Sequence, residues 1–166
     1  MPDTIRLIPL TADGREQFIR DNQRAFRTGA NSEGIPHDTV AACIDALDTE
    51  AYRITEGETN VGGLVLQIDP EAGRGDLLLL FVAPECRGRG IGFAAWQAVE
   101  ALHPEIGVWE TCTPYEDVCN IHFYVNRCGF QIVEFFCTSH PDPLLDPDLP
   151  YEGPEEMFRF EKIIHE

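Results

Sequence analysis

This chain of 166 residues lacks long hydrophobic runs and a recognisable leader sequence. Its longest apolar run is far shorter than the roughly 20 residues that a membrane-spanning helix needs. The N-terminus has no basic region followed by an apolar core, which is the pattern of a secretory signal. The sequence therefore predicts no membrane partner and no export, and we expect a cytoplasmic protein.

Paired cysteines and metal-ligand spacings are also missing. The six cysteines are scattered without C-x-x-C or zinc-finger spacing, in a chain long enough to form a core without disulfides. A cluster of His and Asp residues between His140 and Asp148 matches no zinc or calcium pattern. Reduced thiols and the absence of a metal site are the expectation.

Basic residues are scarce. Twelve Lys and Arg residues are present with twenty-nine Asp and Glu residues, which gives a formal net charge of −17. Such a charge repels nucleic acid and anionic lipid, and it raises the local concentration of cationic small molecules. We expect no nucleic-acid partner. A cationic amine substrate is plausible, although acidity that serves only solubility is the favoured explanation of the same charge.

Short alternating runs and helical periodicities follow one another along the chain, without a repeat or a sign of a second domain. Helices are predicted after Thr11 or Asp13, where Asp13 and Glu16 have the spacing of a capping box. Further helices are predicted at Pro36–Asp48, Ile91–Leu102 and Asp117–Cys128. The predicted strands are Ile5–Leu10, Ala51–Glu56, Asn60–Ile68, Leu77–Val82, Gly107–Thr113, Gln131–Thr138 and Met157–Ile163.

The most informative segment is Asp76–Leu102, in which the apolar strand Leu77–Val82 leads through a glycine-rich turn into a helix. Glycines in such a turn allow backbone N–H groups to face an anion at the helix N-terminus. We predict that a phosphate or pyrophosphate binds there. A turn whose arginines are merely solvated is the alternative. The predicted cradle consists of Arg87, Gly88, Arg89, Gly90, Ile91 and Gly92.

Two common phosphate motifs are absent from this turn. It does not end in Gly-Lys-Ser/Thr, so a nucleoside triphosphate loop with a magnesium-binding hydroxyl is disfavoured. The glycine spacing also lacks the strand-adjacent first glycine of G-x-G-x-x-G, which disfavours a dinucleotide site.

Two motifs resemble those of the GNAT superfamily of N-acetyltransferases. Arg87, Gly90 and Gly92 match the signature R/Q-x-x-G-x-G/A, and Asn120–Phe130 is similar to the family's later helix, N-x-x-x-x-Y-x-x-x-G-F. The resemblance implies one N-acetyltransferase domain over residues 1–166, of class α/β (mixed α+β). It implies a mostly antiparallel central sheet of about six or seven strands, splayed at the CoA site and flanked by about four helices.

The resemblance also implies the reaction, which is direct transfer of acetyl from acetyl-CoA to a primary amine without a metal. In the family the pantetheine arm enters a gap beside the strand before the cradle, a position that Phe81 and Val82 hold here. Asn120 on the later helix is expected to contact CoA or to tie the helix to the neighbouring strand. Arg127, on the same helical face, is expected to meet the CoA phosphate, with solvent as the alternative. A small cationic amine is the expected acceptor. Acetylation of a protein or peptide amine, and a non-catalytic acyl-CoA-binding module, are the alternatives. A homodimer through the last strands is compatible with the family pattern.

Tyr124 is the predicted proton donor to the departing thiolate. Its ordinary pKa near 10 keeps the phenol protonated at neutral pH, and the matching family tyrosine lies beside the CoA sulfur. An aromatic residue that only packs the helix on the sheet is the alternative. His122 is an alternative base, but its offset of two residues from Tyr124 puts it on another helical face and favours a structural role.

The general base is less clear from the sequence. The run Leu77–Val82 contains no acid, so the glutamate that some family members use on that strand is absent. Glu110 is the candidate, because strand alternation with Trp109 permits it to face the cleft. An exposed strand carboxylate explains the same pattern equally well, and water is a further carrier for the proton.

Overall fold

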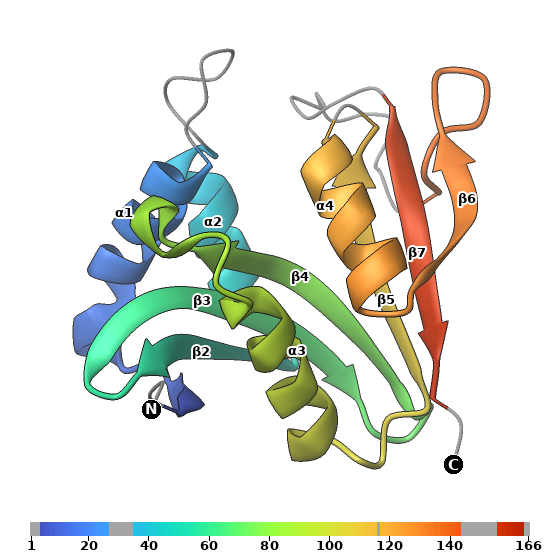
Figure 1. Ribbon diagram of the computed structural model, residues 1–166. Helices are drawn as coiled ribbons and strands as arrows, with labels where there is room; N and C mark the ends of the chain where they lie inside the picture. The colour runs from blue at the N-terminus through green and yellow to red at the C-terminus, as the bar shows by residue number, and fades with distance from the viewer. Residues whose placement is uncertain (1–3, 27–34, 116, 144–155, 165–166) are drawn as a thin grey trace.

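The computed structural model describes residues 4–26, 35–115, 117–143 and 156–164, and their strands form one sheet of order β1-β2-β3-β4-β5-β7-β6 (Figure 1). Every neighbouring pair is antiparallel except β4 and β5, which are parallel. The predicted mixed fold with a mostly antiparallel sheet is confirmed. The strands are β1 Ile5–Pro9, β2 Thr49–Glu56, β3 Thr59–Asp69, β4 Arg74–Val82, β5 Val108–Pro114, β6 Gln131–Phe136 and β7 Met157–Ile163.

Helices cover both faces of this sheet. The helices are α1 Arg15–Ala25, α2 His37–Asp45, α3 Ile91–Leu102 and α4 Val118–His122, and Figure 1 shows α3 and α4 in front of the sheet. Strand alternation sends successive side chains to opposite faces and so supplies a core for each layer. Phe18, Val40, Val65 and Phe81 belong to the core under α1 and α2. The core under α3 and α4 includes Leu64, Leu66, Leu77, Ala95, Trp96, Val99, Trp109 and Tyr124.

The helix cap predicted from the sequence is present at α4, whereas the one predicted at α1 is absent. The Asp117 carboxylate accepts a hydrogen bond from the Asn120 N–H at 3.1 Å, as expected for the N-cap of α4. The capping box expected from Asp13 does not form. A 3₁₀ turn, Ala12–Gly14, includes Asp13 and leaves Gly14 as the N-cap of α1, without a side-chain cap.

The feature that positions the site is the separation of β4 from β5. Their parallel register runs from Arg74 opposite Val108 to Leu77 opposite Thr111 and stops there, although both described strands continue. We call this last pair the vertex. A register shift between Val65 and Leu66 of β3 leaves an extra residue in β4 just beyond the vertex, and such a bulge bends its strand. The expected splay is therefore present, and main-chain groups of β4 beyond the vertex have no partner in β5.

Candidate active site

A cleft of about 580 Å³ lies beside the end of β4. Its wall is formed by the last residues of β4, the glycine-rich turn, the first turn of α3, one side of α4 and the end of α1. The predicted residues Val82, Arg87, Asn120 and Arg127 all contribute to this wall. Gly88, Gly90, Ile91 and Gly92 also line it. Segments far apart in the sequence therefore meet around one concave space, as the two motifs predicted.

The glycine-rich turn is shaped for close approach of a ligand. Gly88 and Gly90 have φ angles of 80° and 76°, a left-handed conformation that favours glycine. A Cβ added at either position would meet no atom within 4 Å, so both backbones face open space. Gly90 is also the N-cap of α3, where unpaired N–H groups and the helix dipole favour an anion. The turn thus fits the pyrophosphate for which it was predicted.

The two arginines of the turn have different surroundings. The Arg87 guanidinium lines the cleft and donates a hydrogen bond to the carbonyl oxygen of Ala25, which ties the turn to the end of α1. Arg89 is not among the residues of the cleft wall. It is half exposed and forms an ion pair with Glu56 at the end of β2. The structure therefore keeps Arg87 in the predicted cradle and moves Arg89 out of it.

The two residues predicted to contact pantetheine, Phe81 and Val82, both line the cleft, but their main-chain groups point in different directions. Ala83 N–H donates to the Val61 carbonyl of β3 at 2.8 Å, and the Phe81 carbonyl lies against Gly62 of the same strand. Main-chain groups of successive strand residues alternate in direction. Those of Phe81 therefore face β3, while those of Leu80 and Val82 face the gap. Phe81 instead contributes its ring to the core against Phe18.

Helix α4 continues into a π-helical turn that the sequence did not reveal. The Phe123–Arg127 turn is closed by the Cys128 N–H, which donates to the Phe123 carbonyl at 3.0 Å. One extra residue per turn changes which side chains share a face. His122 lines the cleft together with Asn120 and Phe123, on another face of the helix than the buried Tyr124, as its offset of two residues predicts. The only sequence feature that could have indicated the π-helical turn is the number of residues between Tyr124 and Gly129.

Tyr124 lies beneath the cleft rather than in its wall. The side chain is 6% exposed and packs against Phe130 and Phe160. Its hydroxyl lies near that of Thr111, which donates a hydrogen bond to the Leu77 carbonyl at 2.9 Å. Burial raises the pKa of Tyr124, so the phenol is protonated at neutral pH. The predicted donor is thus connected to the vertex through Thr111.

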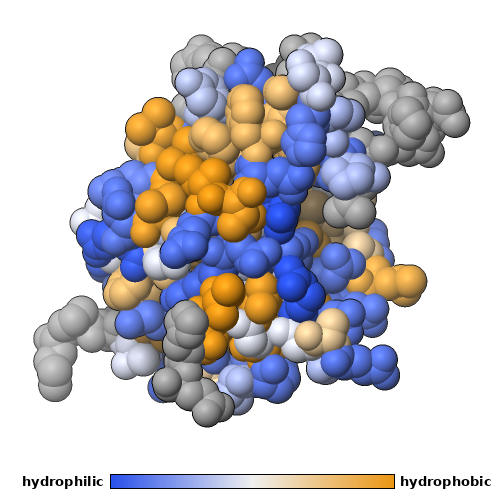
Figure 2. Space-filling view, turned by 90° about the vertical axis from the view of Figure 1, so that its right-hand side faces the viewer, coloured by the Kyte–Doolittle hydropathy of each residue, from blue (hydrophilic) through white to orange (hydrophobic). Residues whose placement is uncertain are grey.

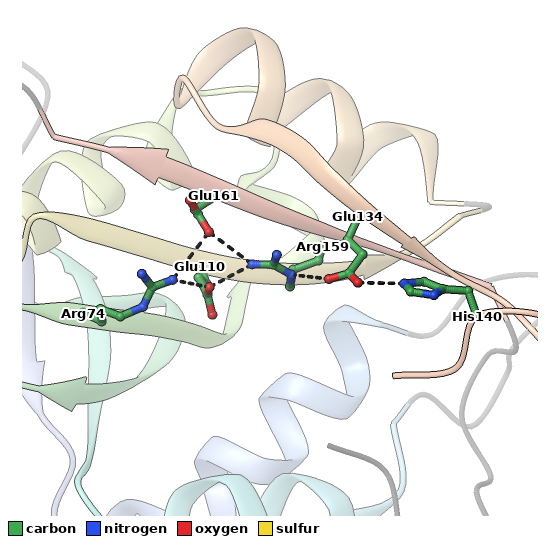
Figure 3. A network of polar contacts seen from close by, with 6 residues as sticks. All are labelled: Arg74, Glu110, Glu134, His140, Arg159 and Glu161. Carbon is green, nitrogen blue, oxygen red and sulfur yellow. Dashed lines mark hydrogen bonds and ion pairs between the residues drawn. The ribbon is translucent and has the colours of Figure 1, made fainter. Parts of the chain in front are cut away.

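Glu110 belongs to an ion-pair network on the face of β5 opposite Trp109 (Figure 3). Arg159 Nη1 donates to Glu110 Oε1 at 2.8 Å, and Arg74 holds the same carboxylate oxygen. The network continues through Glu161, and from Arg159 through Glu134 to His140. Glu110 is not in the cleft wall, and its carboxylate accepts hydrogen bonds from two guanidinium groups. The structure does not bring this candidate base to the cleft.

Asp76 is a site candidate that the sequence reasoning missed. It lies opposite Glu110 in the parallel register, one residue before the vertex. Burial and the negative charge of Glu110 raise the pKa of Asp76 from 3.8 to about 6. In the sequence, Asp76 could be noticed only as an acidic residue directly before the apolar run that begins with Leu77. The raised pKa of Asp76 depends on its pairing with Glu110 of β5, which the local sequence does not show.

Some expected features concern segments that are only partly described. The sequence also predicts that three loops without a recognisable motif, residues 28–34, 69–75 and 140–154, shape the acceptor pocket. The first of them lies outside the described residues, and so does most of the third. Within the described ranges, no group of three or more His, Cys, Asp or Glu side chains is placed to hold a metal ion. None of the helices in those ranges is long and apolar enough to cross a membrane.

Comparisons with known proteins agree with this geometry. A family model described as the acetyltransferase (GNAT) family matches residues 16–130. An uncharacterized protein of Bacillus subtilis (strain 168), YrkN, is 40% identical over 136 residues, which are 78% of this chain and 74% of YrkN. The family match confirms the predictions of an acetyltransferase and of acetyl-CoA as its donor.

Solved structures share the fold at low sequence identity. Arabidopsis thaliana Naa50 in complex with the bisubstrate analogue CoA-Ac-MVNAL has a TM-score of 0.70 at 17% identity, covering 97% of this chain and 99% of that one. A chimera of the Vibrio cholerae spermidine N-acetyltransferase SpeG with hSSAT has a TM-score of 0.68 at 12% identity, covering 97% and 96%. The names of these two proteins concern a peptide and a small amine, so the likeness leaves the acceptor open.

Proposed function

We propose that this chain, which belongs to the acetyltransferase (GNAT) family, transfers acetyl from acetyl-CoA directly to the primary amine of a small cationic molecule. The observation that carries the proposal is the meeting of the β4–β5 splay with a glycine-rich helix N-terminus in one cleft. A strand gap accepts an extended thioester arm through main-chain groups. A helix N-terminus accepts a pyrophosphate. Together they fit one ligand that has both parts.

The residues present divide the work of binding. The backbones of Gly88 and Gly90 and the start of α3 border the open space where a pyrophosphate fits, and Arg87 adds positive charge beside it. The main-chain groups of Leu80 and Val82 are free to pair with a pantetheine amide. Arg127, whose guanidinium lies 5.8 Å from the centre of the Phe93 ring, stands at the wall where further phosphate charge fits. Acetyl-CoA supplies an acyl group activated as a thioester.

We place the acetyl-transfer step near the vertex, the pair Leu77–Thr111. Tyr124, whose hydroxyl lies near Thr111 of the last β4–β5 pair, is proposed as the group that gives a proton to the departing thiolate. Burial favours this role, because it raises the pKa of Tyr124 and keeps the phenol neutral. Holding the reacting groups at one fixed point of the sheet lowers the barrier by proximity.

The acceptor class rests on charge. The net charge of −17 favours the approach of cations, and Asp76, Glu110 and Glu161 gather on the sheet face next to the vertex with two arginines among them. A peptide amine is the second candidate. It is favoured by the likeness to the Naa50 complex, whose analogue carries the peptide MVNAL.

Two experiments test the proposal in sequence. Calorimetric titration with acetyl-CoA, using ATP and NAD as controls, tests the cleft. Turnover is then measured by thiol release with spermidine, an aminoglycoside and the peptide Met-Val-Asn-Ala-Leu as acceptors. Acetylation of the two small cations above the peptide supports the proposal, and preference for the peptide replaces it with the second candidate. Binding without turnover of any acceptor would identify a non-catalytic acyl-CoA-binding module.

A homodimer and a cytoplasmic location remain predictions. The free edge strand β6 carries the exposed apolar side chains Ile132, Val133 and Phe135, and Figure 2 shows apolar groups gathered on the side of the molecule where β6 and β7 lie. All six cysteines are free, as a reducing compartment favours. Light scattering of the purified chain measures the oligomeric state.

A further inference from the structure

Two neighbouring carboxylates at the vertex differ in their surroundings. Asp76 of β4 and Glu110 of β5 are directly paired in the parallel register, and the next pair is Leu77 with Thr111. The Leu77 side chain belongs to the core under α3 and α4, and so does that of Trp109. By alternation, Asp76 and Glu110 therefore point to the opposite face of the sheet.

The Glu110 carboxylate accepts hydrogen bonds from two arginines, whereas the Asp76 carboxylate accepts none from the described residues. Arg74 and Arg159 both donate to the Glu110 carboxylate. The carboxylate of Asp76 makes no hydrogen bond or ion pair with any residue that the structure describes, although it is largely buried. A partly buried carboxylate without a donor keeps its lone pairs available for a proton.

The position of Asp76 complements that of Tyr124. The Tyr124 phenol reaches the vertex from the α4 face through Thr111. Asp76 lies one residue from the vertex on the other face. Asp76, like Tyr124, borders the vertex without lining the cleft wall itself. An acyl carbon held at the vertex end of the gap would have the phenol on one face of the sheet and the carboxylate on the other, an arrangement that suits acyl transfer to an amine.

We infer that Asp76 is the general base that removes the proton from the acceptor amine. The inference rests on the proposed function. The amine nitrogen forms a bond to the thioester carbonyl carbon, and the carbon–sulfur bond breaks. The proton on nitrogen goes to the Asp76 carboxylate, and the departing thiolate takes a proton from Tyr124. The products are the amide and the CoA thiol, and protons exchange with solvent to restore both side chains.

The charges around Asp76 suit this role. Burial is the largest influence on its pKa, and Glu110 is the next; together they raise it to about 6. Arg159 and Arg74 lower it, and Asp142, in the segment after β6, raises it. A base is most effective when its pKa lies near the working pH. Asp76 is therefore ionised at neutral pH while still able to hold a proton.

The nearby thiol is not a competing base. Cys112 of β5 lies on the same face as Glu110. Its thiol is exposed on one side, and partial desolvation by its neighbours, followed by the charges of Asp76 and Asp142, raises its pKa. It is therefore uncharged at neutral pH. Covalent catalysis by this thiol is disfavoured for the same reason, since the thiolate is the nucleophile.

The test compares three matched variants, Asp76→Asn, Glu110→Gln and Glu71→Gln. Glu71 is an exposed carboxylate in the loop between β3 and β4 and serves as the control. For each protein kcat/KM is measured across pH with spermidine and with the peptide Met-Val-Asn-Ala-Leu, and acetyl-CoA affinity is measured by calorimetry. A fourth variant, Asp76→Glu, retains a carboxylate at this position and tests for rescue.

The base assignment predicts a loss of about 100-fold in kcat/KM for Asp76→Asn, with acetyl-CoA affinity unchanged. The parent's acid limb near pH 6 disappears in this variant. Glu110→Gln keeps the limb but moves it to lower pH, because a negative charge beside Asp76 is removed. Asp76→Glu restores part of the activity, and Glu71→Gln matches the parent.

Two outcomes overturn the inference and are distinguishable. If the parent binds acetyl-CoA and acetylates a probe, but Asp76→Asn stays within about threefold of it with the same pH profile, Asp76 is not the base. If the parent fails to bind acetyl-CoA or to acetylate either probe, the proposed function fails, and the assignment of a base fails with it.

Discussion

Replacing Asp76 by Asn is expected to stabilise the folded protein while it removes activity. The folded state raises the pKa of Asp76 from 3.8 to about 6, mainly through burial. At about 1.36 kcal/mol per pH unit, this rise corresponds to about 3 kcal/mol of folding free energy. A group with a raised pKa contributes its full stability below its unfolded pKa. That contribution is lost as the pH rises through the folded pKa.

The window follows from those two pKa values. The parent loses stability relative to Asp76→Asn as the pH rises from about 4 to above 6, and about half of the 3 kcal/mol is lost between about pH 5 and about pH 8. Measurements between about pH 5 and about pH 8 keep the protein above its pI of about 4.5, at which its solubility is lowest. Urea denaturation followed by circular dichroism at both pH values measures the difference, with Glu71→Gln as the control.

The reasoning is refuted if the stabilities of parent and Asp76→Asn change in parallel with pH. A parallel change would mean that Asp76 has an ordinary pKa in the folded protein. It would remove the electrostatic support for its role as the base, whereas the geometry at the vertex would stand. A larger stability gain at about pH 8 than at about pH 5 is the predicted result.

Three further results are expected from the cleft. Tyr124→Phe lowers kcat by about tenfold or more with unchanged acetyl-CoA affinity, measured by steady-state kinetics and calorimetry. Gly90→Ala weakens acetyl-CoA binding by about tenfold, because it adds strain and a methyl group in the cradle, whereas Gly73→Ala, with a similar φ of 66° outside the cleft, does not. Arg87→Ala weakens binding in the same titration, and Arg89→Ala changes it by less than about twofold, as expected of an exposed ion pair.

The sequence predicted the strands well because short apolar or alternating runs are bounded by turn residues. Strand β4 and helix α3 fall where the apolar run and the helical spacing indicated, and Gly129 has the positive φ of 86° expected after the later helix. The splay of β4 from β5 was predicted from the family resemblance. A parallel pairing that ends at Leu77 depends on contacts between distant segments, which local patterns do not encode.

The misplaced residues share a physical cause. Arg89 is drawn to Glu56, which is 33 residues away in the sequence, so its local spacing gave no warning. His122 lines the cleft while Tyr124 is buried beneath it, because tertiary packing decides which face of the helix is covered by the sheet. Asp76 acquires its properties from Glu110 across a parallel pair and from burial by the fold. Each depends on tertiary structure.

The central claim is that the glycine-rich turn and the splayed strands bind acetyl-CoA. Calorimetric titration of the purified chain with acetyl-CoA, ATP and NAD tests it most directly. The account predicts saturable binding of acetyl-CoA, weakened in Gly90→Ala and retained in Gly73→Ala, with no comparable binding of ATP or NAD. Absence of acetyl-CoA binding, or equal binding by both variants, would contradict it.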